Sequence, residues 1–137
     1  MDMSRPKPVL AGWLLVYVEY TILVFAMRGL SLWFVLTGDI GIMARGGDFR
    51  FHFWTSVLLE LMAAAVLILF WRRARVAPWA AVIREAAVPA VNAAQMLLFG
   101  PESVFWEIAL AETAAAIGWI AYLLRSRRAR EYFVSTP

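Results

Sequence analysis

Four long apolar stretches, separated by short polar or charged segments, dominate the hydropathy pattern of this chain. Because a helix rises about 1.5 Å per residue, a hydrocarbon core of about 30 Å requires roughly 20 residues. The four stretches reach that length and predict transmembrane helices at Val9–Met27, Phe53–Trp71, Pro78–Leu98 and Val104–Leu124. The predicted fold class is therefore all-α, a single polytopic four-helix transmembrane bundle over residues 1–137.

The third stretch is the most polar of the four. Its charged and amide residues fall within an arc of about 100° on a helical wheel, and they are Arg84, Glu85, Asn92 and Gln95. Such a face is poorly suited to lipid but suits a helix packed among neighbours. We therefore expect this face to point into the bundle.

The basic residues predict how the chain is oriented. Nine of them flank the spans on one side, and they are Arg5, Lys7, Arg72, Arg73, Arg75, Arg125, Arg127, Arg128 and Arg130. The other side has only Arg28, Arg45 and Arg50, all in the loop between the first two spans. The positive-inside rule then places both termini in the cytoplasm of a bacterial inner membrane. The arginines that follow the second and fourth spans are also expected to contact lipid headgroups.

The long outer loop, from Arg28 to His52, has two parts. Leu30–Leu36 is apolar and either prolongs the first helix or lies in the membrane interface. Thr37–Arg50 is rich in glycine and charge and predicts an exposed turn. Amphipathic rings near the predicted span ends are expected to anchor the interfaces, and they are Trp33, Trp54, Trp71, Trp79, Trp106 and Tyr122.

Carboxylates inside the spans are the candidate functional groups, because ionisable side chains at bilayer depth are costly. They are Glu19, Glu60, Glu85, Glu107 and Glu112. Stripes of small residues accompany three of them and predict helix–helix contacts: Gly12, Glu19 and Ala26; Ser56, Glu60, Ala63 and Ala64; Glu107, Ala111, Ala114 and Gly118. Glu112 points about 140° away from the Glu107 stripe and needs a different neighbour.

Three interpretations of these groups remain open. Arg84 alone cannot neutralise five carboxylates, so some are protonated, hydrated, or paired with a ligand or another protein. The groups either link the helices by hydrogen bonds, or line a cavity for a proton, a cationic or zwitterionic ligand or a lipid headgroup, or form a docking surface for another membrane subunit. Hydrogen bonds between helices in membranes average only about 0.6 kcal/mol, so helix linking alone is a weak explanation for five carboxylates inside the spans.

Several function classes lack their motifs. The chain has no cysteine and a single histidine, His52, so thiolate chemistry is excluded and a zinc or haem site is not expected. It has no glycine-rich phosphate loop, nucleophile elbow or dinucleotide fingerprint, so the sequence disfavours an enzyme and predicts no cofactor. A continuous basic stripe is also missing, which argues against a nucleic-acid partner.

The two ends of the chain resemble a known family. Gly12-Trp13-Leu14-Leu15 opens the first span, and Trp119-Ile120-Ala121-Tyr122-Leu123-Leu124-Arg125-Ser126-Arg127-Arg128 closes the fourth, followed by Tyr132-Phe133-Val134. These two segments are similar to the bacterial inner-membrane proteins of domain-of-unknown-function family 2569. This chain departs from the family pattern at three positions: Ala121, Ala129 and Tyr132 stand where the family has proline, valine and threonine. The resemblance implies a four-span fold in the inner membrane and assigns no catalytic residues.

Two functional hypotheses follow. The first is a non-enzymatic accessory or assembly partner of a larger membrane complex, whose glutamate faces pack within and between subunits. The alternative is a small proton- or cation-linked transporter, or a protein that binds a lipid or another ligand. It would be a homodimer that uses Glu19, Glu60, Arg84 and Glu112. In both, the expected partners are membrane lipids and another membrane protein or a second copy.

Overall fold

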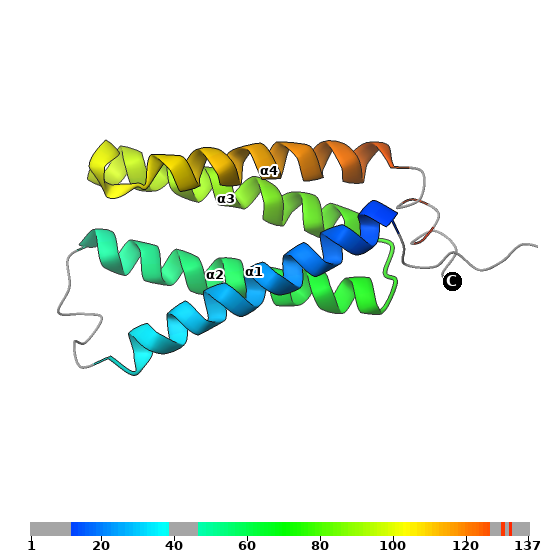
Figure 1. Cartoon of the computed structure of the whole chain (residues 1–137), viewed down its shortest axis with the longest axis horizontal. Coiled ribbons are helices and arrows are strands. Elements are labelled where there is room, and N and C mark those ends of the chain that lie inside the picture. The colour runs from blue at the N-terminus through cyan, green and yellow to red at the C-terminus, as the bar shows by residue number, and fades with distance from the viewer. Residues whose placement is uncertain (1–11, 39–46, 127–129, 131, 133–137) are drawn as a thin grey trace, which may run out of the picture.

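The computed structural model describes residues 12–38, 47–126, 130 and 132. Within these residues the chain forms four long α-helices and one short 3-10 helix (Figure 1): α1 (Gly12–Leu36), α2 (Gly47–Trp71), α3 (Ala77–Phe99), η2 (Pro101–Ser103) and α4 (Trp106–Arg125). All four α-helices are long and apolar enough to cross a membrane. The prediction of an all-helical chain with four apolar helices of spanning length is confirmed.

The helices pack in chain order, with α1 on α2, α2 on α3, and α3 on α4. Figure 1 shows α3 and α4 running side by side, whereas α1 crosses α2 obliquely. As a result, the C-terminal end of α1 and the N-terminal end of α4 lie far apart (Figure 1). The bundle is therefore close-packed at one end and splayed at the end where α1 finishes and α2 begins.

The main apolar core occupies the close-packed end. Its buried members are Leu14, Tyr17, Val66, Phe70, Ala77, Ala81, Leu123 and Tyr132. The Tyr17 ring lies 5.7 Å from the Phe70 ring and 5.0 Å from the Trp119 ring, measured between centroids. Such pairs typically contribute about 0.5–1.5 kcal/mol beyond the burial of their area. This aromatic cluster joins α1, α2 and α4 where the helices converge.

The turn between α2 and α3 is short and fixed by backbone hydrogen bonds. The Arg73 N–H donates to the Phe70 carbonyl (3.1 Å) and the Ala74 N–H to the Leu69 carbonyl (3.0 Å). With Arg73 at φ 52°, this is a Schellman motif, which ends a helix by placing one residue in the left-handed region. The Arg73 guanidinium also lies 4.5 Å from the centre of the Tyr132 ring, so the turn contacts the C-terminal segment.

Threonine hydroxyls inside the helices are satisfied locally. Thr21 donates to the Tyr17 carbonyl (2.9 Å), and Thr113 donates to the Ala109 carbonyl (2.8 Å). Because the acceptor is in the preceding turn of the same helix, these hydroxyls need no partner from lipid or from another helix. They are therefore poor candidates for a binding site.

Two sequence predictions about the first loop need comment. Leu30–Leu36 prolongs the first helix, which is one of the two alternatives left open. The prediction of an exposed turn through Arg50 is wrong in its last part, because α2 begins at Gly47 rather than Phe53. Tertiary contact overrides the local glycine signal here, since the Phe51 ring packs 5.6 Å from the Phe99 ring of α3. Residues 39–46 lie outside the described part of the chain.

Candidate functional site

A buried ion pair lies at the centre of the bundle. Arg84 and Glu85 of α3 are only 1% and 2% exposed, and Arg84 Nη1 donates to Glu85 Oε1 at 2.6 Å. The Tyr17 hydroxyl of α1 donates to the same Oε1 at 3.0 Å. Adjacent residues on a helix do not normally face each other. Both side chains are buried here because α3 has α2 and α4 packed against it, and Tyr17 of α1 reaches it from a third direction.

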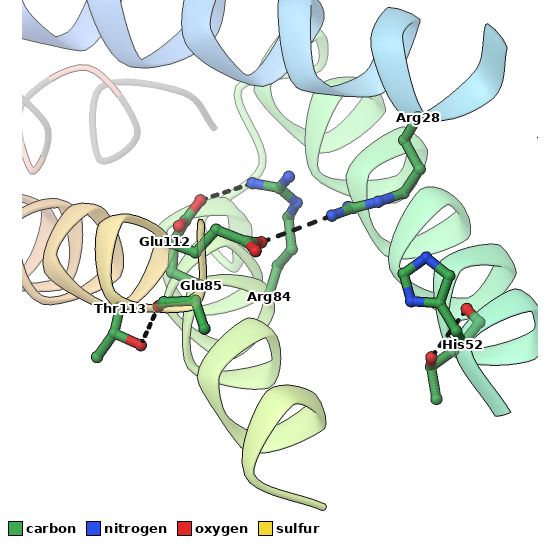
Figure 2. A network of polar contacts seen from close by, with 8 residues as sticks. Arg28, His52, Arg84, Glu85, Glu112 and Thr113 are labelled. Carbon is green, nitrogen blue, oxygen red and sulfur yellow. Dashed lines mark hydrogen bonds and ion pairs between the residues drawn. The ribbon is translucent and has the colours of Figure 1, made fainter. Parts of the chain in front are cut away.

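A second, looser pair lies nearer the splayed end. Arg28 Nη2 of α1 is 3.9 Å from Glu112 Oε2 of α4, beyond hydrogen-bond distance. Figure 2 shows the Arg28 and Glu112 side chains extending toward each other from different helices, with Arg84 beside them. Arg28 is also close enough to be repelled by the charge of Arg84 and attracted by that of Glu60. The cluster thus contains two guanidinium groups that face a shared set of carboxylates.

These side chains border a cavity of about 610 Å³, to which all four helices contribute. Arg28 lies about 12 Å from the end of α1, Asn92 about 10 Å from the end of α3 and Glu112 about 9 Å from the start of α4, at 1.5 Å per residue. These three polar residues therefore lie at one level, below the splayed end. Arg84 and Glu85 line the deeper part of the same cavity.

Four buried polar atoms around this cluster have no hydrogen-bond partner among the described residues. Three are donors, namely Arg28 Nη1, Arg84 Nε and Asn92 Nδ2, and one is an acceptor, Glu60 Oε1. An unmet buried polar atom costs about 1–3 kcal/mol, and such atoms are rare in native proteins. The three donors belong to residues that line the cavity, but the donor atoms themselves are covered in this conformation, so a molecule inside the cavity binds them only when these side chains shift.

Glu60 of α2 lies next to the cavity and does not line it. Its carboxylate rests against the backbone of α1 at Gly29, where a Cβ atom would come within 2.7 Å of Glu60 Oε2. The absence of a side chain at Gly29 is what allows this close approach. Glu60 therefore sits beside Arg28, where it adds negative charge behind that guanidinium.

Two predicted polar faces are found where they were expected. On α3, Arg84, Glu85 and Gln95 are buried and Asn92 is half-buried, so the shared face points into the bundle. On α2, Ser56 and Ala63 are buried, and Glu60 and Ala64 are half-buried. Glu112 faces away from the Glu107 stripe and finds a separate neighbour, Arg28, as its angle predicts. What these residues do stays a prediction.

The prediction for α1 is wrong within this bundle. Gly12, Glu19 and Ala26 are all exposed, so this stripe makes no buried helix contact. The helix instead buries Leu14, Tyr17 and Thr21. The small residues of this stripe lie on the face away from the core, and both faces are apolar enough that hydrophobicity does not distinguish them.

The prediction for α4 is wrong in the same way. Its small-residue stripe is exposed throughout, over Glu107, Ala111, Ala114 and Gly118. The buried residues of α4 are Ala116 and Leu123, on a different side of the helix. Glu19 and Glu107 consequently do not join the cavity.

The basic residues lie at the close-packed end. Arg72, Arg75, Arg125 and Arg130 are exposed, and Arg73 is half-buried against Tyr132. Arg127 and Arg128 lie outside the described residues. The exposed arginines are available to headgroups or solvent, and their proposed role in topology remains a prediction.

Sequence reasoning missed two residues of the site. Arg28 was assigned to the outer loop because the first span was ended at Met27, and Tyr17 was not singled out. A signal was present: Leu14, Tyr17, Thr21 and Arg28 recur at steps of three, four and seven residues, the spacing of one helix face. Three polar groups at that spacing mark the inward face better than the small-residue stripe does.

The arrangement can hold a charged or dipolar group but offers no obvious nucleophile. Among the described residues, no three histidine, aspartate or glutamate side chains gather as metal ligands. His52 is exposed and borders the outer part of the cavity. Comparisons with protein-family models, with curated proteins and with solved structures find no match. The resemblance to family 2569 therefore stays a prediction.

Proposed function

We propose that this chain is a membrane-embedded binding protein that holds a polar group in the cavity between its helices. The observation that carries the proposal is the set of three buried donors, Arg28 Nη1, Arg84 Nε and Asn92 Nδ2, that have no acceptor among the described residues. All three residues line one cavity of about 610 Å³, a size typical of small-molecule sites. This is the ligand-binding form of the alternative that the sequence left open.

The competing interpretation, that the charged groups only link the helices, fits the geometry less well. Linking groups would satisfy one another, as Arg84, Glu85 and Tyr17 partly do. Arg28 and Glu112 instead face each other at 3.9 Å with no hydrogen bond between them. A ligand that supplies acceptors would recover the free energy that these donors lose on burial.

The proposed location is a bacterial inner membrane, with both termini in the cytoplasm. The support is the positive-inside distribution of arginines together with four apolar helices of spanning length. In that orientation the splayed end of the bundle, and with it the level of Arg28 and Glu112, lies in the outer leaflet. A ligand would then approach from the lipid or from the outer surface.

Native mass spectrometry of the protein extracted in a mild detergent tests the binding proposal. We expect the wild-type chain to retain a bound molecule and Arg28→Gln to lose it, because the substitution removes the guanidinium but keeps a polar side chain. Glu107→Gln is the matched control, since Glu107 is exposed outside the cavity. Equal retention by Arg28→Gln, or a wild-type protein that is always free of ligand, would contradict the proposal.

A second candidate function is that of an accessory or assembly partner of a larger membrane complex. The observation that favours it is Glu19, a carboxylate exposed on the outside of α1 about 10 Å from the start of that helix. Ionisable groups at such depth rarely face lipid, so a partner that offers a donor or a cation to Glu19 would remove the cost.

Site-specific crosslinking in native membranes tests this candidate. A photoreactive residue at position 22, on the same exposed side of α1, is expected to capture one defined protein, and Glu19→Gln in the same chain should reduce the yield. A probe at buried Ala81 serves as the control. Recovery only as a monomer, without any crosslinked protein, would count against the accessory function.

A further inference from the structure

The charges that line the cavity are balanced, and this balance narrows the class of ligand. Among the lining side chains, Arg28 and Arg84 contribute two positive charges and Glu85 and Glu112 contribute two negative charges when ionised. The balance holds when Glu60, which lies beside Arg28 but outside the lining, is protonated. A simple anion would satisfy the free donors but leave excess negative charge in a buried site. A simple cation would leave the three donors without acceptors. A ligand that carries both charges and has no net charge avoids both costs.

The positions of the two charges match a dipolar ligand. Arg28 on α1 and Glu112 on α4 lie on opposite walls, at about the same level, and their nearest N and O atoms are 3.9 Å apart without a hydrogen bond (Figure 2). Arg28 and Asn92, whose donors are unmet, both line the cavity and can be donors to an anionic group. Glu112, whose side chain is 30% exposed, offers carboxylate oxygens to an ammonium group.

Most of the remaining lining is apolar, which indicates that the ligand is amphiphilic. From the level of Arg28 to the splayed end, the cavity is bordered by hydrocarbon side chains that include Met27, Leu30 and Val35 of α1 and Phe49 of α2. An amino acid or another small hydrophilic zwitterion has no hydrocarbon chain to bury against this apolar wall. A headgroup attached to a hydrocarbon chain would place the chain against it.

We propose, on the basis of the binding function above, that the cavity holds the headgroup of a zwitterionic phospholipid with a primary ammonium group. The phosphate accepts hydrogen bonds from Arg28, Asn92 and Arg84, and the ammonium donates to Glu112. The acyl chains lie along the apolar wall toward the splayed end. The same head chemistry exists in water-soluble form as O-phosphoethanolamine, so the two sources must be separated by experiment.

The test uses the full chain, delipidated in a maltoside detergent and titrated with four probes: phosphatidylethanolamine, phosphatidylcholine, phosphatidylglycerol and O-phosphoethanolamine. Binding is measured by native mass spectrometry and by thermal unfolding. We expect phosphatidylethanolamine to bind at least about tenfold more tightly than the other three probes. Phosphatidylcholine lacks N–H donors for Glu112, and phosphatidylglycerol lacks the positive charge.

Two variants test the role of each charge by removing one positive or one negative side chain from the cavity. Arg28→Gln should weaken phosphatidylethanolamine binding at least about tenfold, because the phosphate loses a charged donor. Glu112→Gln leaves the cavity with an excess positive charge and should shift the preference toward phosphatidylglycerol. Glu107→Gln, on the exposed face of the same helix, should bind like the wild type. Because Glu112 is partly exposed, the Glu112→Gln variant is expected to fold even if the Arg28→Gln variant does not.

The outcomes separate this inference from the proposed function. If phosphatidylglycerol binds as tightly as phosphatidylethanolamine and both depend on Arg28, the binding function stands and the zwitterion inference is overturned. If only O-phosphoethanolamine binds, the lipid source is overturned. If no probe responds to Arg28→Gln or Glu112→Gln, the zwitterion inference fails, whereas the binding function fails only if Arg28→Gln also keeps the molecule that the wild-type protein retains on extraction.

Discussion

Tyr17 belongs to both halves of the bundle. Its ring packs against Phe70 and Trp119 in the aromatic cluster, and its hydroxyl donates to Glu85 at the floor of the polar cluster. The side chain is fully buried. Tyr17 therefore fixes where the apolar core ends and the polar cavity begins, and its two roles are separable because only one of them needs the hydroxyl.

Tyr17→Phe should keep the ring packing and lose the hydrogen bond to Glu85. We expect the free energy of unfolding to fall by about 1 kcal/mol, between the average for membrane hydrogen bonds and that for bonds to charged groups. Titration of the purified protein with sodium dodecyl sulfate measures this change. Tyr20→Phe is the matched control, since Tyr20 is only half-buried and its hydroxyl makes no such bond in the described chain. Equal effects of the two substitutions would contradict this role for Tyr17.

Arg84 and Glu85 should behave as a unit. Arg84→Met leaves the buried Glu85 carboxylate with Tyr17 as its remaining donor, and we expect a loss of about 3 kcal/mol, as for other broken buried pairs. The double substitution Arg84→Met with Glu85→Met removes both charges and should cost less than Arg84→Met alone. Chemical unfolding of the four proteins of the cycle gives the coupling energy. Additive losses would show that the two side chains are independent.

At the scale of the element, the two outer helices show why sequence reasoning chose the wrong face. In a soluble helix the apolar side is the buried side, but lipid and protein core are both apolar, so in α1 and α4 the more apolar side of the helix does not identify the buried side. The small-residue rule selected Gly12 and Gly118, which are exposed. The inward face of the inner helix α3 was predicted correctly because that face is polar, and a polar face is poorly suited to lipid.

Helix extent was predictable to within a few residues at most ends but not between the first two helices. The end of α1 depends on whether Leu30–Leu36 continues the helix, which composition does not decide. The start of α2 depends on ring packing between Phe51 and Phe99, two residues far apart in sequence. The error mattered for the site, because it moved Arg28 from a helix into a loop.

Two glycines allow the exposed and buried faces to be compared directly. A Cβ at Gly118 of α4 would meet nothing within 4 Å, so Gly118→Ala should stabilise the isolated bundle by about 0.5–1 kcal/mol through helix propensity. At Gly29 of α1 the new Cβ would lie 2.7 Å from Glu60 Oε2 and should displace that carboxylate, which offsets the gain. Thermal unfolding in detergent compares the two. A lower melting temperature for Gly118→Ala would indicate that this face is packed in the purified protein.

At the scale of the whole molecule, the natural absence of cysteine makes orientation easy to measure. A single cysteine at Thr37, beyond the end of α1, should react with a membrane-impermeant maleimide in intact cells. A cysteine at Arg75, in the turn between α2 and α3, should react only after the membrane is permeabilised, if both termini are cytoplasmic. Ala81→Cys, at a fully buried position, is the unreactive control. The reverse pattern for Thr37 and Arg75 would invert the proposed topology.

The aromatic cluster of Tyr17, Phe70 and Trp119 closes one end of the bundle, and the cavity stops above it. A molecule that enters from the splayed end therefore meets a blind floor and must leave by the side through which it came. Passage across the bilayer would require these rings to separate and the core to be rebuilt around them. In this conformation the proposed binding protein can hold a molecule but cannot pass it across the bilayer, and transport would demand a second arrangement of the same four helices.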